Sequence, residues 1–159
     1  MPEEDLQVLS FILNDQQYAL PIAHIMRVVR MVAVTPAPNT PRMIEGVVNI
    51  SGNVVPVLNM RARLNFPWQQ YDSQNHLIFV RTRMQTLGLI VDQVREVFTL
   101  TPAEINPVTE LGSDINRFLS AVGKLQDRLL LILDVESLLS IAEEEQLLGA
   151  IGETATLGM

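Results

Sequence analysis

The sequence predicts a mainly β fold of two similar subdomains, and short apolar runs are the first observation that indicates it. Ten runs rich in valine, isoleucine and leucine recur along the chain, and turn residues separate many of them. Strands at this spacing are typical of antiparallel barrels or a sandwich. The runs are 8–13, 18–22, 26–34, 46–50, 54–58, 77–80, 87–91, 96–100, 121–125 and 129–133.

An internal repeat is the second observation. Residues 46–64 match residues 121–139 at an offset of 75, each as strand, three-residue turn, strand and helix start. Residues 18–28 recur as residues 87–97 at an offset of 69. Chance similarity between apolar strand pairs is the alternative explanation. The repeat predicts a duplication, with subdomains at about 14–75 and 76–139 within a domain spanning 6–139.

Helical signals are few. Thr101 and Glu104 have capping-box spacing around a proline, which predicts a single turn. Asp134 can cap a longer helix over 134–148, because apolar residues follow it on one face. From 149 to 159 the sequence has no period, and we expect a flexible tail.

Charge is placed unevenly along the chain. The 159 residues carry 18 acids and 11 bases, a net charge of −7. Seven acids lie at the two ends, so the body from 6 to 142 is charge-neutral. Without a basic surplus, and with only 5% aromatic residues, a nucleic-acid partner is not expected.

The remaining composition predicts a cytosolic protein. A hydrophobic content of 48% is ample for one buried core. The absence of cysteine excludes disulfides, thiol catalysis and cysteine-ligated zinc. No apolar stretch approaches the ~20 residues of a membrane-spanning helix, and the acidic N-terminus is unlike a signal peptide. We therefore expect no membrane insertion.

Residues for catalysis or metal binding are scarce. His24 and His76 have no carboxylate or second histidine at a metal-ligand spacing, so both are interpreted as surface or loop residues. Ser51 lacks the flanking glycines of a nucleophile elbow and reads as a turn residue. Asp92 and Asp134 each follow a strand, but Asp134 is explained as a helix cap. We expect no catalytic site, metal or cofactor.

With catalysis and metal binding not expected, the sequence is most consistent with a binding module. Ten of the 11 basic residues are arginine, which favours protein interfaces, although codon bias explains this equally well. Arginines that alternate along the strands, such as Arg81 and Arg83, also fit an ordinary solvated face.

One segment carries a family resemblance. Residues 46–61 read GVVNISGNVVPVLNMR, which is similar to the hallmark G-V-x-N-L-R-G-x-I-V-P-V-x-D-L-R of CheW, the adaptor of bacterial chemosensory arrays. Further landmarks follow in family order: Phe11 with 18–22, then 38–41, 87–94 and 128–134. The chain thus resembles the CheW family from about Leu6 to Leu139.

The resemblance implies two small five-stranded barrels on a shared core and a non-enzymatic adaptor. It implies two partners, the regulatory domain of a CheA-type histidine kinase and the cytoplasmic hairpin tip of a chemoreceptor. The adaptor would be monomeric alone and assembled in arrays at the inner face of the membrane. Positions that match the receptor groove are Ile25, Arg27, Gly46, Ser51, Gly52 and Leu87. The kinase side points to Leu20 and Ile22.

Three positions depart from the family pattern. Arg27 replaces a usual glutamate, Ser51 a usual arginine and Asn59 a usual aspartate. Asparagine caps a helix about as well as aspartate, whereas the other two changes alter the charge of the expected receptor groove. A divergent receptor, or another sensory pathway such as twitching motility, is therefore an alternative. A small β-barrel enzyme is a less favoured one, because it needs a histidine beside Asp92 or Asp134.

Overall fold

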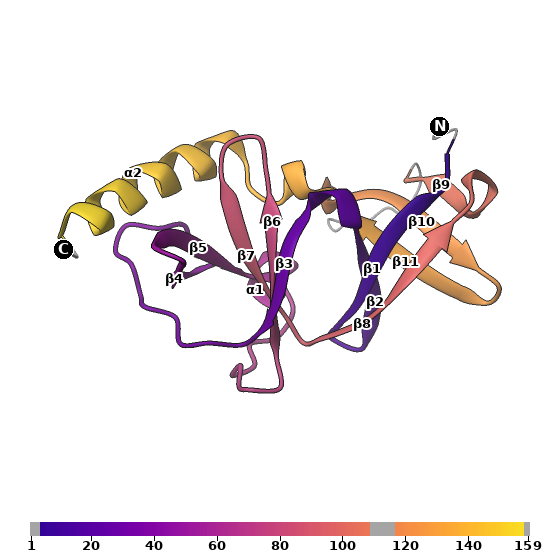
Figure 1. Cartoon of the computed structure of the whole chain (residues 1–159), viewed down its shortest axis with the longest axis horizontal. Helices are drawn as coiled ribbons and strands as arrows, with labels where there is room; N and C mark the ends of the chain where they lie inside the picture. The colour runs from indigo at the N-terminus through magenta and orange to yellow at the C-terminus, as the bar shows by residue number, and fades with distance from the viewer. Residues whose placement is uncertain (1–3, 109–116, 158–159) are drawn as a thin grey trace.

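The computed structural model describes residues 4–108 and 117–157, with side chains described as far as Ile151. Two β-sheets lie side by side, and one long helix extends from the molecule beside the smaller sheet (Figure 1). The six-stranded sheet contains β1 (Leu6–Leu13), β2 (Gln16–Pro21), β8 (Gln93–Leu100), β9 (Ile105–Pro107), β10 (Leu119–Leu125) and β11 (Arg128–Leu133). The five-stranded sheet contains β3 (Ile25–Arg30), β4 (Ile44–Ile50), β5 (Asn53–Asn59), β6 (His76–Arg81) and β7 (Thr86–Val91).

Helical segments connect or follow the strands. The α-helices are α1 (Met60–Arg63) and α2 (Ile141–Leu157), and the short 3-10 turns are η1 (Ile22–His24), η2 (Pro102–Glu104) and η4 (Val135–Ser137). Asn59 caps α1 by accepting a hydrogen bond from the Ala62 amide. The predicted capping box of Thr101 and Glu104 is confirmed at η2.

Strand register confirms the duplication. The parallel pair β5–β7 joins Val57 to Gly88, and the parallel pair β11–β2 joins Ile132 to Ala19. These pairings are related by the offsets of 75 and 69 read from the sequence. The same offsets relate the antiparallel ladders β3–β6 to β8–β1, β6–β7 to β1–β2, and β4–β5 to β10–β11. Five strands of each sheet are therefore equivalent.

The two halves of the sequence exchange hairpins, which corrects the predicted division of the subdomains at residue 75. Hairpin β1–β2 of the first half completes the sheet formed by β8 to β11, and hairpin β6–β7 of the second half completes the sheet of β3 to β5. Only η1 separates β2 from β3, and only Asp92 separates β7 from β8, so the chain crosses directly between sheets at both points. Residue 75 divides the repeat in sequence, not the sheets in space.

The mainly β, two-subdomain prediction is confirmed, with one difference in strand number. The resemblance implied five strands in each subdomain, and one sheet has six because β9 pairs with β10. In the five-stranded sheet a single bridge from Thr35 to Val47 lies at the comparable place on β4. The sequence did not predict β9, because this strand has only three residues, contains Pro107 and directly follows η2.

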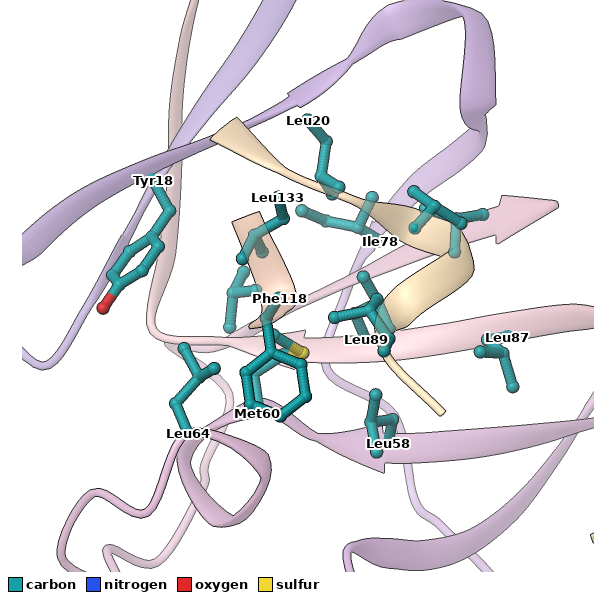
Figure 2. Packing of buried hydrophobic residues seen from close by; sticks show 14 of the residues in the cluster. Tyr18, Leu20, Leu58, Met60, Leu64, Ile78, Leu87, Leu89, Phe118 and Leu133 are labelled. Carbon is teal, nitrogen blue, oxygen red and sulfur yellow. The ribbon is translucent and has the colours of Figure 1, made fainter. Parts of the chain in front are cut away.

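The largest hydrophobic cluster lies between the sheets and draws on both. Leu20 and Leu133 come from the six-stranded sheet, Ile78 and Leu89 from the five-stranded sheet, and Figure 2 shows them around one interior. A fully buried aliphatic side chain contributes about 1.5–3 kcal/mol to stability, so this shared core joins the two subdomains into one domain. Two smaller clusters each belong to one sheet.

The C-terminal helix differs from its predicted bounds of 134–148. Asp134 caps η4, where its carboxylate accepts from the Glu136 amide, and α2 begins only at Ile141. Ser140 and Glu143 form a reciprocal capping box, with distances of 2.8 Å and 3.1 Å, which starts the helix there. The helix continues to Leu157, through most of the segment predicted as a tail. The last two residues of that predicted tail lie outside the described residues.

Candidate partner-binding groove

A groove of about 490 Å³ lies between the five-stranded sheet and α2. Its walls are supplied by all five strands of that sheet, the turn between β6 and β7, and one face of α2. Its lining is Met26, Arg27, Ile50, Asn53, Val54, Val55, Pro56, Phe79, Arg81, Met84, Gln85, Thr86, Leu148 and Ile151. Most of these side chains are apolar, which is typical of a surface that binds another molecule.

A β-bulge places Met26 in the groove. The register of β3 against β6 shifts between Ile25 and Arg27, so Met26 is the extra residue of the bulged strand. A bulge turns its extra side chain away from the regular alternation, and Met26 is 60% exposed. The hydroxyl of Thr86 donates to the Met26 sulfur at 3.5 Å and holds the side chain beside β7.

The turn between β6 and β7 presents a second methionine, Met84, which is 43% exposed. The Thr82 hydroxyl accepts from the amides of Met84 and Gln85 at 3.2 Å and 3.0 Å, which fixes the turn. The carboxylate of Glu136 accepts from the Arg83 amide at 3.0 Å and ties the turn to η4. The polar contacts thus hold Met84 in one place on the rim.

The charge of the groove is positive. Arg27 and Arg81 line it, and its described lining contains no aspartate or glutamate. Among the described residues, no ion pair involves either arginine, although an Arg81 guanidinium nitrogen donates to the Thr86 hydroxyl at 3.4 Å. The groove therefore combines an apolar floor with an unneutralised cationic rim, where a carboxylate on a partner gains charge-assisted hydrogen bonds.

Three of the six predicted groove positions are at or beside this groove. Arg27 lines it directly. Ser51 and Gly52 form the exposed turn between Ile50 and Asn53, both of which line the groove. Both turn residues have positive φ, 52° and 85°, and the Gly52 amide donates to the Asn49 side chain at 3.0 Å. Ser51 is thus a turn residue, as predicted.

The other three positions face inward. Ile25 is half-buried and packs against the shared core, and Leu87 is fully buried within it. Gly46 is buried at a bulge of β4 with φ of 154°, where a Cβ would clash with the Thr35 carbonyl. On the predicted kinase side, Leu20 is likewise a core residue, whereas Ile22 is half-buried in η1.

Sequence reasoning did not predict that Met26, Met84 and Arg81 line the groove, or that α2 forms one of its walls. The exposure of Met26 depends on a bulge that leaves no mark in the apolar pattern. Leu148 and Ile151 are three residues apart on one helical face, a spacing that could have indicated a shared contact had the helix been extended beyond 148.

The histidines and carboxylates do not converge. His24 is exposed at the end of η1. His76 was predicted to lie in a loop, but it is the first residue of β6. Its Nδ1 accepts a hydrogen bond from the Val94 amide at 3.3 Å. Burial and the nearby Arg30 lower the pKa of His76, which favours this neutral acceptor form.

Both candidate carboxylates have structural partners. Asp92 accepts two hydrogen bonds from the Arg61 guanidinium, at 3.0 Å and 2.7 Å, and one from the Asn14 amide. Asp134 caps η4. Within residues 4–108 and 117–157, no hydrogen bond or ion pair joins a histidine to either carboxylate, and no cluster of three potential metal ligands occurs. The described helices include none long and apolar enough to cross a membrane.

Fold and groove together define a duplicated two-sheet β protein with a mainly apolar groove beside its C-terminal helix. Comparison with known families agrees, because the model of the CheW-like domain matches residues 7–143. The chain belongs to this CheW-like family.

Relatives and a solved structure extend the match. A chemotaxis protein CheW of Helicobacter pylori is 35% identical over 137 residues, which are 86% of this chain and 83% of the relative. A chemotaxis protein CheW of Klebsiella aerogenes is 30% identical over 138 residues, with the same shares. The crystal structure of the scaffolding protein TtCheW from Thermoanaerobacter tengcongensis superposes with a TM-score of 0.81 at 28% identity, covering 90% of this chain and 96% of the other. The chain is therefore a CheW-type chemotaxis coupling or scaffold protein.

Proposed function

We propose that the chain is a non-catalytic adaptor that links the cytoplasmic hairpin of a chemoreceptor to the regulatory domain of a CheA-type histidine kinase. It would act in the cytoplasm, be monomeric alone, and reach the inner face of the membrane through receptor arrays. Family membership supports the adaptor role. The apolar, arginine-rimmed groove carries the proposal, because it is a surface that can dock the receptor hairpin.

The receptor side of the proposal uses Arg27 and the Ser51–Gly52 turn. These residues lie on or beside the groove, and they match family positions for the receptor. Gly46 and Leu87 act from beneath, since both are buried and shape β4 and β7. Their part in binding is to position the groove.

The kinase side of the proposal uses the surface around Ile22. This residue lies in η1, where the chain crosses from one sheet to the other, and the buried Leu20 anchors the strand before it. A change in packing between the sheets would reach η1 directly. Receptor binding can influence the kinase only if the two receptor states contact the adaptor differently, which is the linkage condition for any coupling protein.

Co-purification tests this function. The tagged full chain is mixed with the regulatory domain of a CheA-type kinase and with a receptor hairpin, both encoded in the same genome. We expect the chain to retain both partners. Arg27→Glu should reduce retention of the hairpin and leave retention of the kinase domain unchanged. Arg95→Glu is the matched control, because Arg95 is an exposed arginine on β8 that does not line the groove. A folded chain that retains neither partner would overturn the proposal.

The two charge departures favour a receptor that differs from the usual family partner, or a related sensory pathway. Arg27 lines the groove and Ser51 lies in the turn beside it, so their altered charges bear on partner choice. Restoring the family charges with Arg27→Glu and Ser51→Arg together should weaken binding to the chain's own receptor hairpin. Unchanged affinity in the double variant would contradict this part of the proposal.

A further inference from the structure

Helix α2 forms a wall of the groove with residues that lie beyond the family match. The CheW-like match ends at residue 143, whereas Leu148 and Ile151 line the groove. Leu148 is 41% exposed there, and Ile151 packs partly against the shared core. The wall therefore belongs to a part of this chain that the match to the family does not cover.

Polar contacts hold α2 against α1, the loop before β4 and the turn between β6 and β7. Glu143 accepts from the Arg63 guanidinium at 2.9 Å, and the Gln146 side chain donates to the Asn39 carbonyl at 3.0 Å. The buried Glu144 carboxylate accepts from the Gln85 side chain at 3.4 Å. Gln85 belongs to the turn that presents Met84. The α2 wall is therefore linked to the methionine rim, which Met26 and Met84 form.

Exposed apolar side chains gather in this groove. Nine large hydrophobic residues are exposed in the described part of the chain, and three of them, Met26, Met84 and Leu148, line it. They come from β3, from the β6–β7 turn and from α2, so they surround the floor on different sides. Methionine side chains are flexible and adapt to the shape of a partner.

We infer that α2 is part of the receptor docking site, and that the groove accepts one amphipathic helix that packs between α2 and the methionine rim. The apolar face of that helix lies on Met26, Met84 and Leu148, and it carries a carboxylate that faces Arg27 and Arg81. The inference rests on the proposed receptor-binding function and adds to it a determinant outside the family match.

Two features select this occupant. One wall is already a helix, and a second helix packs against a helix at an axial distance of about 8–10 Å, with anchors spaced three or four residues apart. The two arginines have no carboxylate partner in the described lining, so an acidic residue on the occupant supplies the missing charge. An apolar helix without that acid leaves both guanidinium groups facing an uncharged surface.

The test measures the affinity of the full chain for the cytoplasmic hairpin of a receptor encoded in the same genome, by isothermal titration calorimetry. Leu148→Asn should weaken binding roughly tenfold, because it places an amide where an apolar contact forms. Ile141→Asn is the matched control, because Ile141 lies on the same helix, is 75% exposed and does not line the groove. Leu148→Ala, which removes side-chain atoms without adding a polar group, should weaken binding less.

The acid is located by a second set of titrations. Each acidic residue of the hairpin is changed to its amide, one at a time. Changing the residue that faces Arg27 and Arg81 should weaken binding of the hairpin to the wild-type chain. The same change should not weaken binding to a chain that carries both Arg27→Gln and Arg81→Gln. A wild-type chain that does not bind the hairpin contradicts the proposed function itself. A wild-type chain that binds, together with Leu148 variants of unchanged affinity, contradicts the inference about α2 and leaves the function standing. If no hairpin acid couples to the two arginines, the acidic contact is wrong.

Discussion

Replacing Gly46 by alanine should destabilise the fold rather than remove a partner contact. Gly46 is buried at the β4 bulge with φ of 154°, a backbone conformation that L-residues rarely adopt. A Cβ there would overlap the Thr35 carbonyl oxygen and lie 2.9 Å from Pro36 Cα. These are backbone atoms, and Thr35 is fixed by two hydrogen bonds with Val47 at 2.9 Å and 2.8 Å. The clash therefore has no flexible side chain to absorb it.

The magnitude follows from two costs. A side chain held in a disfavoured backbone conformation costs about 1–3 kcal/mol. Forcing an extra carbon into a packed position costs about 1–3 kcal/mol more. We expect Gly46→Ala to lower the free energy of unfolding by about 2–6 kcal/mol. For a chain of this size each kcal/mol corresponds to about 2–4 °C in Tm.

Urea unfolding followed by circular dichroism measures this loss, with Gly52→Ala as the control. Gly52 also has positive φ, 85°, but a Cβ there would meet nothing within 4 Å. Its substitution should cost about 1 kcal/mol, from the backbone conformation alone. If the two variants unfold with equal free energies, the close approach of Thr35 to β4 is not a constraint and the reasoning fails.

Three further predictions concern charged and titratable groups. Arg61→Lys should lower the free energy of unfolding by about 1–2 kcal/mol in urea, because a lysine ammonium cannot reproduce the two parallel hydrogen bonds that the planar guanidinium donates to Asp92. Unchanged stability would contradict this. Burial raises the pKa of Tyr18 to about 12 from 10.0, so stability should fall as pH rises from about 10 to 12, and Tyr18→Phe should remove that part of the loss. Burial also raises the pKa of Glu144, so its ionised form is disfavoured in the folded chain; Glu144→Gln should raise Tm at pH 7 and lose this advantage below the ordinary carboxyl pKa of 4.5. A Glu144→Gln variant less stable than the wild type at pH 7 would show that the carboxylate contributes more than its burial costs.

The strands and the repeat were predictable because both depend on local pattern. Apolar runs such as 54–58 and 129–133 became β5 and β11, and the offsets of the repeat reappear in the strand registers. The hairpin exchange was not predictable. Which sheet receives β6 and β7 depends on the path of the chain at η1 and Asp92, and the sequence pattern is the same for either arrangement.

The site was only partly predictable, for a related reason. Arg27 and the Ser51–Gly52 turn were found through matched motifs, and the structure brings them to one groove. Gly46 and Leu87 belong to the same motifs, but a motif does not separate a residue that contacts a partner from one that shapes the strand beneath it. Met26 was missed because its exposure arises from a bulge.

The start of α2 shows how a local signal can be outweighed by a stronger one nearby. Asp134 is a sound cap, yet it starts only the three residues of η4. The reciprocal capping box of Ser140 and Glu143 starts the long helix six residues later, and Glu143 is held further by Arg63. The consequence is that the shifted helix places Leu148 and Ile151 on the groove.

A bridging measurement tests the central claim most directly. The receptor hairpin is immobilised, and the regulatory domain of the CheA-type kinase is passed over it with and without the chain. An adaptor predicts that the kinase domain is retained strongly only when the chain is present, and that Arg27→Glu reduces this retention. Equal retention with and without the chain, while the chain is folded and bound to the hairpin, would contradict the account.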